Sequence, residues 1–138
     1  MVVRAGDPPV AVLHHEGSVT ASRYWGAPPA YMPVPPGIPG SYDNAFHQTG
    51  LQRFLLLLRP LHESLQAGPL DEWRGNRAIG VQYHHEFEWH NYVPTKLASR
   101  YDAFVHIDRT KAVKPFDMAV ATPESVPRWD AETYPDAY

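Results

Sequence analysis

Proline is the feature that most restricts how this chain can fold. The 138 residues include 15 prolines, about twice the usual share of roughly 5%, and they concentrate between Ala27 and Tyr42 (APPAYMPVPPGIPGSY). Proline fixes φ and lacks an N–H donor, so helix interiors and central strands are excluded and we expect an extended loop here. The loop either binds an aromatic polyproline-recognising groove or packs on its own domain through Tyr31, Met32, Val34 and Ile38, and we favour packing.

Four short apolar runs between turn-forming residues predict strands. They are VAVLHH from Val10, RFLLLLR around Phe54, RAIGVQY from Arg77 and DAFVHID from Asp102. Because these runs are continuous rather than alternating, they are typical of strands buried on both faces.

Two short helices are expected between the strands. SYDNAFHQTG offers Ser41 as an N-cap and Gly50 as a C-terminal stop, and VPTKLASR from Val93 could form the second helix. The order of elements predicts a mixed α/β domain with short helices and a Pro-rich loop. We expect one domain over residues 1–121 and a tail of low order over residues 122–138, where three prolines interrupt a sequence without periodicity.

Composition restricts the partners and the compartment. A net charge of −3 provides no basic face for nucleic acid. The longest apolar run, Phe54 to Leu58, is far shorter than the roughly 20 residues that span a bilayer, and the first ten residues do not form a signal peptide. Because cysteine is absent, thiolate catalysis and Cys-containing zinc sites are excluded. We expect a cytoplasmic protein that binds neither nucleic acid nor membrane.

The densest group of ionisable residues is VQYHHEFEWHNY, Val81 to Tyr92. As a strand it would present four candidate metal ligands on one face, namely His84, Glu86, Glu88 and His90. Residues two apart in a strand are about 6.6 Å apart along it, so one ion cannot easily collect all four, and a helix would only pair Glu86 with His90. These residues are therefore weak candidates, and we expect no metal site and no cofactor.

A candidate pocket combines His15 and Glu16, near the end of a strand, with His47 in the first short helix. The carboxyl ends of strands in α/β sheets open onto the crevice where ligands bind. His15 could act as a general base, although neighbours in a strand point to opposite faces, so Glu16 is a poor partner for it. His106 lies in a strand among apolar neighbours and is interpreted as a partly buried residue whose hydrogen bonds are satisfied.

A set of motifs in one order resembles the C-terminal part of the erythromycin esterase family. They are EGSVTAS (16–22), PGSYDNAFHQTG (39–50), RFLLLLR (53–59), RAIGVQY (77–83), NYVP (91–94) and YDAFVHIDRTKAVKP (101–115). The resemblance covers about residues 10–117 and implies the C-terminal half of an α/β hydrolase fold. It also implies a bacterial, cytoplasmic enzyme of an antibiotic-resistance type, whose best-known relatives open the lactone ester of the macrolide erythromycin with a histidine-assisted water and no obligatory metal.

The same resemblance implies that this chain is inactive alone. In the family, the catalytic histidine and its acidic and arginine partners precede the segment that EGSVTAS resembles, so no catalytic residue can be carried over. Gln48 stands where relatives usually have Glu, and His84 and His85 stand where they more often have Arg and Pro.

Two hypotheses remain open. The favoured one is a C-terminal fragment of an esterase-like hydrolase, from a truncated or split gene, whose partner is an N-terminal catalytic half and whose substrate in the intact family is a small-molecule ester. The alternative is a free-standing α/β module that binds a small molecule or a metal. Whether the chain is itself an enzyme stays undecided.

Overall fold

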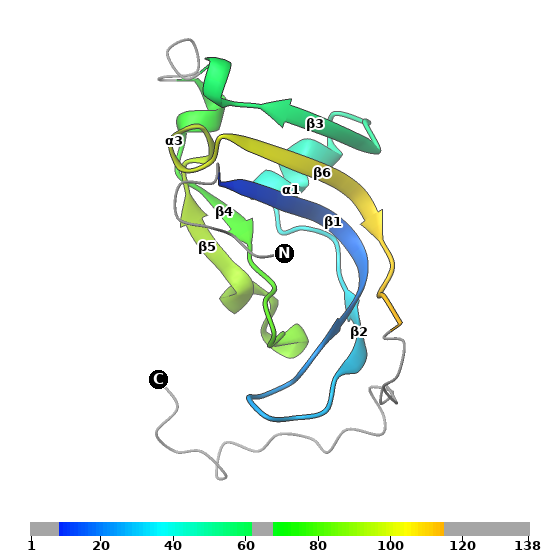
Figure 1. Cartoon of the computed structure of the whole chain (residues 1–138). Helices are drawn as coiled ribbons and strands as arrows, with labels where there is room; N and C mark the ends of the chain where they lie inside the picture. Colours follow the sequence, from blue (N-terminus) through cyan, green and yellow to red (C-terminus); the bar gives the residue numbers. More distant parts are fainter. Residues whose placement is uncertain (1–8, 62–67, 115–138) are drawn as a thin grey trace.

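The computed structural model describes residues 9–61 and 68–114, which form two sheets and a few short helices (Figure 1). The proposed boundary at residue 121 and the tail over 122–138 lie outside these residues. None of the helices in the described ranges is long and apolar enough to cross a lipid bilayer. The mixed α/β fold class predicted from the sequence is confirmed.

The elements follow one another in the chain as six strands, two α-helices and three 3₁₀ helices within the described ranges. They are β1 (Val10–Ala21), β2 (Ala30–Val34), α1 (Tyr42–His47), β3 (Arg53–Leu57), η1 (Arg59–Leu61), η2 (Pro69–Asp71), β4 (Arg74–Arg77), η3 (His85–Asn91), β5 (Tyr92–Thr95), α3 (Leu97–Arg100) and β6 (Ala103–Thr110).

The larger sheet has the order β2-β1-β6-β3. β1 and β6 are parallel at its centre, and the edge strands β2 and β3 pair with them in antiparallel fashion. β4 and β5 form a separate antiparallel pair. α1 contacts β1, β4 and β6, so it lies between the larger sheet and the β4–β5 pair (Figure 1).

Two apolar clusters lie on the covered side of the larger sheet. The first joins Leu13 and Phe104 of the central strands to Tyr42 and Phe46 of α1. The second surrounds Met32, Val34 and Tyr83 near the β1–β2 hairpin.

α1 begins where the sequence predicts, because the Ser41 hydroxyl accepts a hydrogen bond from the Asn44 N–H at 3.1 Å.

The Pro-rich segment contains β2, so the prediction of a loop throughout is wrong. An edge strand needs backbone hydrogen bonds on one side only, and Pro33 is therefore tolerated opposite Ser18. Met32 and Val34 are buried in the second cluster, which supports packing of this segment on its own domain rather than its use as a polyproline ligand.

The strand predicted from Arg77 is also misplaced. β4 ends at Arg77, and the following residues make only one isolated bridge, between Gln82 and Ser22. This bridge lies just beyond the end of β1, where no neighbouring strand continues. The helix expected from Val93 is shorter than predicted, because residues 92–95 form β5 and only Leu97–Arg100 are helical.

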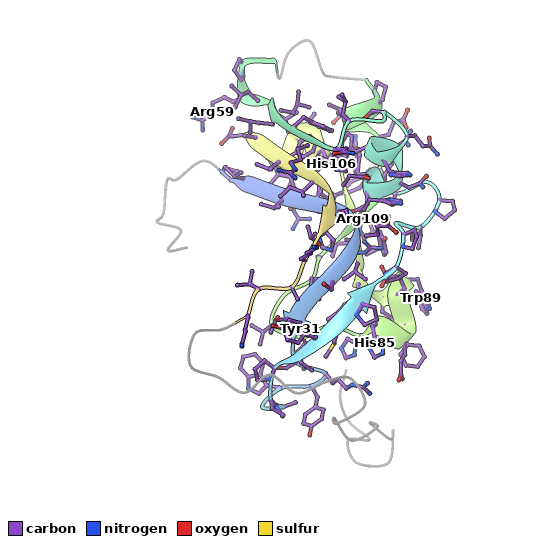
Figure 2. The ribbon with its side chains drawn as sticks, turned by 90° about the vertical axis from the view of Figure 1, so that its right-hand side faces the viewer. Tyr31, Arg59, His85, Trp89, His106 and Arg109 are labelled. Carbon is purple, nitrogen blue, oxygen red and sulfur yellow. The ribbon has the colours of Figure 1, made fainter. Side chains whose placement is uncertain are left out.

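No helix of residues 9–61 and 68–114 covers one face of the larger sheet. Val12 of β1, Val105 of β6 and Leu55 of β3 lie side by side across it, and Val10, Ala103 and Leu57 form the next row. The side chains with the largest exposed fractions in these rows are Val10 at 41%, Val12 at 62%, Leu55 at 60% and Leu57 at 54%. We call this surface the open face. Figure 2 shows α1 and η3 on the other side of the sheet.

The open face therefore corrects the expectation that these strands are buried on both faces. Within residues 9–61 and 68–114 the apolar runs are covered on one face only, because the described helices all lie on the side of α1 and the β4–β5 pair.

Candidate functional site

Three of the sequence's ionisable residues meet beside α1. The rings of His15 and His47 are stacked, with centroids 3.8 Å apart and planes at 6°. Nδ1 of His47 lies 2.8 Å from Oδ1 of Asp108. The predicted pairing of His15 with His47 across the fold is therefore observed, and Asp108 completes what we call the histidine cluster.

The register of the parallel strands explains this meeting. His14 pairs with Ile107 and Glu16 with Arg109, so His15 lies beside Asp108 on the covered face of the sheet. His47 is the last residue of α1, which carries its ring over that of His15. The cluster thus lies toward the carboxyl ends of two parallel strands, the position where α/β sheets place ligands.

Hydrogen bonds fix the protonation pattern of the two rings. Gly37 N–H donates to Nδ1 of His15 at 3.3 Å, so the proton of the neutral His15 ring is on Nε2. An ionised Asp108 only accepts, so His47 donates Nδ1–H to it and leaves Nε2 free. The His47 side chain is 46% exposed, whereas His15 is buried.

Burial and neighbouring charges shift the pKa values of the groups in the cluster. Burial, followed by the charge of His47, lowers the pKa of His15. Burial alone would raise the pKa of Asp108, but the hydrogen bond and the charge of His47 hold that pKa below its usual value. Asp108 is therefore ionised near neutral pH, while His15 is neutral.

His106 forms the floor of the cluster. It is fully buried, packs against Phe54 and Phe46, and its Nε2 lies 3.7 Å from Oδ1 of Asp108, too far for a hydrogen bond. Burial lowers the pKa of His106. The expectation of a hydrogen-bonded, partly buried residue is therefore wrong, because His106 is fully buried and neither ring nitrogen has a hydrogen-bond partner in the described part of the chain.

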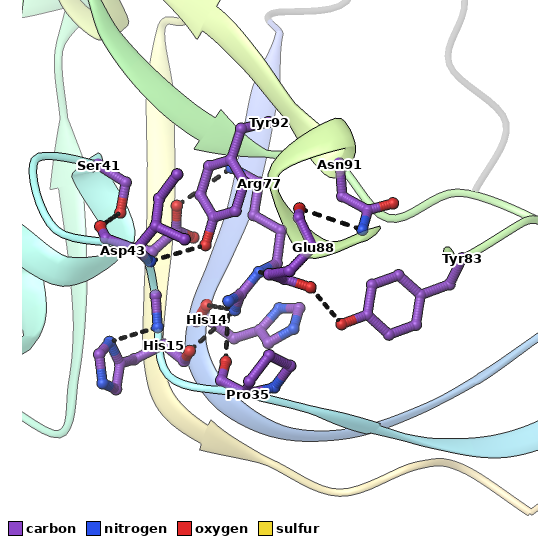
Figure 3. Close-up of polar contacts among 12 residues, drawn as sticks. His14, His15, Pro35, Ser41, Asp43, Arg77, Tyr83, Glu88, Asn91 and Tyr92 are labelled. Carbon is purple, nitrogen blue, oxygen red and sulfur yellow. Dashed lines mark hydrogen bonds and ion pairs between the residues drawn. The ribbon is translucent and has the colours of Figure 1, made fainter. Parts of the chain in front are cut away.

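An ion pair between the buried Arg77 and the partly buried Glu88 holds the backbone beneath the histidine cluster. Arg77 Nε donates to Glu88 at 2.6 Å, and its two other nitrogens donate to the carbonyl oxygens of His14, His15 and Pro35. The second oxygen of Glu88 accepts from Tyr83 at 2.6 Å (Figure 3). Arg77 thereby links β1, the Pro-rich segment and η3.

Asp43 is a buried carboxylate next to this ion pair. It is fully buried in the first turn of α1, and one oxygen accepts from the Arg77 N–H at 3.1 Å. Burial raises the pKa of Asp43 to about 6. A Cβ at Gly37 would lie 2.9 Å from the Asp43 Cβ and 3.2 Å from Nδ1 of His15, so only glycine fits between them without displacement.

Glu16 does not join His15 and His47. It pairs with Arg109 on the neighbouring strand, as expected for a strand neighbour whose side chain points to the opposite face. Of the three residues proposed for a pocket, the structure therefore brings His15 and His47 together, with Asp108 beside His47 and Glu16 on the opposite face.

The candidate metal ligands of the Val81 to Tyr92 stretch are not gathered around one point. They belong to or precede η3, which is a kinked pair of 3₁₀ turns rather than a strand. Glu88 is engaged by Arg77 and Tyr83, and Glu86 lies 3.8 Å from Arg23. Among residues 9–61 and 68–114, no three His, Asp or Glu side chains are arranged so that they could hold a metal ion.

Sequence reasoning missed Asp108, Arg77 and Asp43. Asp108 could have been identified from the sequence, because the two-residue period of FVHID places His106 and Asp108 on one face of a strand. Arg77 and Asp43 carry no comparable signal, since their contacts depend on how α1, β1 and β4 pack together.

Comparisons with known proteins identify a family through one family model and a fold through two solved structures. A family model described as erythromycin esterase matches residues 9–110. The chain is similar to a crystal structure of a Bacillus cereus protein, with 18% identity, a TM-score of 0.59 and coverage of 74% of this chain and 24% of that chain. It is also similar to a crystal structure of a succinoglycan biosynthesis protein, with 22% identity, a TM-score of 0.57 and the same coverage. The chain thus spans about a quarter of the length of these structures.

Proposed function

The chain belongs to the erythromycin esterase family, and we propose that it works as one segment of an esterase-like hydrolase of small-molecule carboxylic esters, macrolide lactones among them. In this proposal the remainder of the hydrolase fold packs on the open face and supplies the family's catalytic histidine with its acidic and arginine partners. The segment alone is then inactive.

The observation that carries the proposal is the open face. Val12 and Leu55 are each about 60% exposed on it, although they belong to continuous apolar runs typical of strands buried on both faces. Covering such a side chain contributes on the order of 1 kcal/mol. Contiguous exposed apolar surface of this kind marks an interaction site.

The length of the structural relatives supports the same interpretation. Each is about four times as long as its match to this chain, since only 24% of it is covered. A larger fold of the same kind contains enough additional residues to form a layer over the open face. If nothing covers the edge strand β3, its unpaired backbone groups can pair with another chain and promote aggregation.

Reconstitution of hydrolysis tests the proposal. The chain would be assayed for opening of the erythromycin lactone, followed as a mass gain of one water, alone and together with the residues of an erythromycin-hydrolysing family member that lie outside its match to this chain. We expect hydrolysis only in the mixture. Hydrolysis by the chain alone, or none in the mixture, contradicts the proposal.

A matched pair of variants locates the contact. Leu55→Lys places a charge on the open face, whereas Leu51→Lys changes a similarly exposed leucine, 56% against 60%, that precedes β3. We expect Leu55→Lys to abolish the hydrolysis of the mixture and Leu51→Lys to preserve it. Equal activity of the two mixtures would contradict docking on the open face.

A second candidate function is a small-molecule-binding module. A hollow of about 530 Å³ adjoins the open face and is lined by the apolar Val10 and Val12 together with His14, Arg77 and Lys111. Such a lining suits a small apolar ligand with an anionic group. A stable monomer that ignores the complementary segment but gains thermal stability from such a ligand would favour this alternative.

A further inference from the structure

We propose that the hollow beside the open face receives a neutral amide side chain, that of an Asn or Gln, from the remainder of the hydrolase. The inference rests on the proposed function for the identity of the partner, and it deepens that function by naming the chemistry of one contact. The open face then supplies apolar contact area, whereas the hollow selects the partner and fixes its position.

Unpartnered polar atoms line the hollow. Within residues 9–61 and 68–114, Nε2 of His14, Oδ1 of Asn76 and Oγ1 of Thr110 are buried and make no hydrogen bond, and all three residues belong to the lining. Asn76 is the most enclosed of them, since only 6% of it is exposed. Buried polar groups are nearly always hydrogen-bonded, and an unsatisfied one destabilises the fold. The three atoms therefore indicate a partner that brings hydrogen-bonding groups to this place.

The three atoms come from three strands. His14 lies in β1, Asn76 in β4 and Thr110 at the end of β6, and Figure 1 shows β4 on the concave side of the curved β1. Burial and the charge of Arg77 lower the pKa of His14 to about 4, so its ring is neutral near pH 7. The unpartnered groups are thus an imidazole, an amide and a hydroxyl, and none of them carries a charge.

The charges around the hollow favour a neutral occupant. Arg77 contributes to the lining, but its side chain is fully buried and bonded to Glu88 and to backbone carbonyl groups. A cation from the partner would be repelled by Arg77 and Lys111, and a carboxylate cannot donate the hydrogen bond that Oδ1 of Asn76 requires. A primary amide can donate to that oxygen through its NH₂ group and accept from the Thr110 hydroxyl through its own oxygen.

The shape of the hollow favours a covering chain over a small molecule. Its wall includes Val10 and Val12, which also belong to the open face and are 41% and 62% exposed. A small molecule resting there would stay open to water, whereas small-molecule sites enclose most of their ligand. A chain packed on the open face would continue across these two residues and close the hollow.

Three small compounds test the chemistry of the hollow on the full chain without any partner. Propionamide, propionate and propylammonium are similar in size and differ in charge. Each would be titrated at constant ionic strength while the side-chain amide signal of Asn76 and the methyl signals of Ile79, another lining residue, are followed by NMR. We expect saturable shifts with propionamide only, and their loss in Asn76→Leu. Shifts with either ion in place of propionamide, or with none of the three, overturn the inference.

Two isosteric variants test docking of the partner. Thr110→Val removes a hydroxyl that lines the hollow, whereas Thr95→Val removes one that donates to the Val93 carbonyl and lies outside the lining. We expect Thr110→Val to preserve the stability of the chain and to weaken binding of the complementary segment about 10-fold. Thr95→Val should lower stability and preserve binding.

The outcomes separate the inference from the proposed function. If Thr110→Val binds the complementary segment as tightly as the unaltered chain does, while Leu55→Lys does not bind, the inference is overturned and docking on the open face stands. If the unaltered chain does not bind the segment at all, the proposed function falls and the partner named here falls with it.

Discussion

Arg77 is the side chain on which most polar contacts beneath β1 converge. It is fully buried, and its guanidinium serves one carboxylate and three carbonyl groups. A buried charge is tolerated only when it is paired and its donors are used. The same guanidinium lies 5.3 Å from the centroid of the Tyr92 ring, which adds a cation–π contact.

Replacing Arg77 is expected to destabilise the folded chain strongly. Arg77→Met would leave Glu88, whose side chain is only 16% exposed, without its cation and three backbone carbonyl groups without their donor, and we expect the free energy of unfolding to fall by about 3–5 kcal/mol. The control is Arg74→Met, which breaks the more exposed pair with Glu72 at 2.6 Å and is expected to cost about 1 kcal/mol or less. Urea unfolding followed by circular dichroism measures both, and similar losses for the two variants would contradict this role of Arg77.

At the residue scale, the sequence predicts the histidines better than their partners. His15 and His47 are recognisable because each lies near the end of a predicted element. Their carboxylate could have been identified from the strand period around His106, but not its distance to His47. Glu16 shows that residues adjacent in the sequence need not belong to the same site, since the side chains of neighbours in a strand point to opposite faces.

At the scale of elements, β1 has two faces with opposite surroundings. Leu13 is 1% exposed in the first cluster, whereas the adjacent Val12 is 62% exposed on the open face. The strand is therefore stabilised from one side within the described residues.

This difference predicts unequal mutational costs. Leu13→Ala is expected to lower the free energy of unfolding by about 2–5 kcal/mol through lost burial and a cavity. Val12→Ala in the same chain is expected to change it by no more than about 0.5 kcal/mol. Chemical denaturation of both variants decides the point, and a large cost at Val12 would mean that the open face is already covered in the isolated chain.

Which elements could be predicted depended on whether their signals were local. α1 and the three long apolar strands carry local signals, a cap or a hydrophobic run, and they form where expected. β2 could not be predicted from local sequence. A proline is compatible with a strand only when that strand lies at an edge, and whether a strand lies at an edge depends on the arrangement of the whole sheet. Likewise, residues 78–84 look like a strand but form only one isolated bridge, between Gln82 and Ser22.

At the scale of the whole molecule, buried histidines link stability to pH. Burial lowers the pKa of His14 to about 4 and also lowers those of His15, His85 and His106. In the unfolded chain these groups take up protons near pH 6.5, so acid favours unfolding through them. Asp43 acts in the opposite direction, because its raised pKa of about 6 lets the folded state bind a proton first.

We therefore expect stability to fall as the pH is lowered from about 6.5 to 4, since four histidines with lowered pKa values oppose one carboxylate whose pKa is raised. Each excess proton bound by the unfolded state corresponds to about 1.4 kcal/mol per pH unit. His106→Leu removes one of these groups and is expected to flatten the slope. Thermal melts at several pH values measure it, and stability that rises toward pH 4 would contradict this account.

The central claim is that the open face is buried against the rest of a hydrolase, and methyl NMR tests it most directly. With methyl-labelled chain, the complementary segment of an erythromycin-hydrolysing family member would be titrated while the Val12, Leu55 and Leu57 signals are followed. The account predicts large shifts for these three methyl-bearing residues and small ones for Leu13 and Leu58, which are already buried. Shifts confined to other surfaces, or no shifts at all, would contradict it.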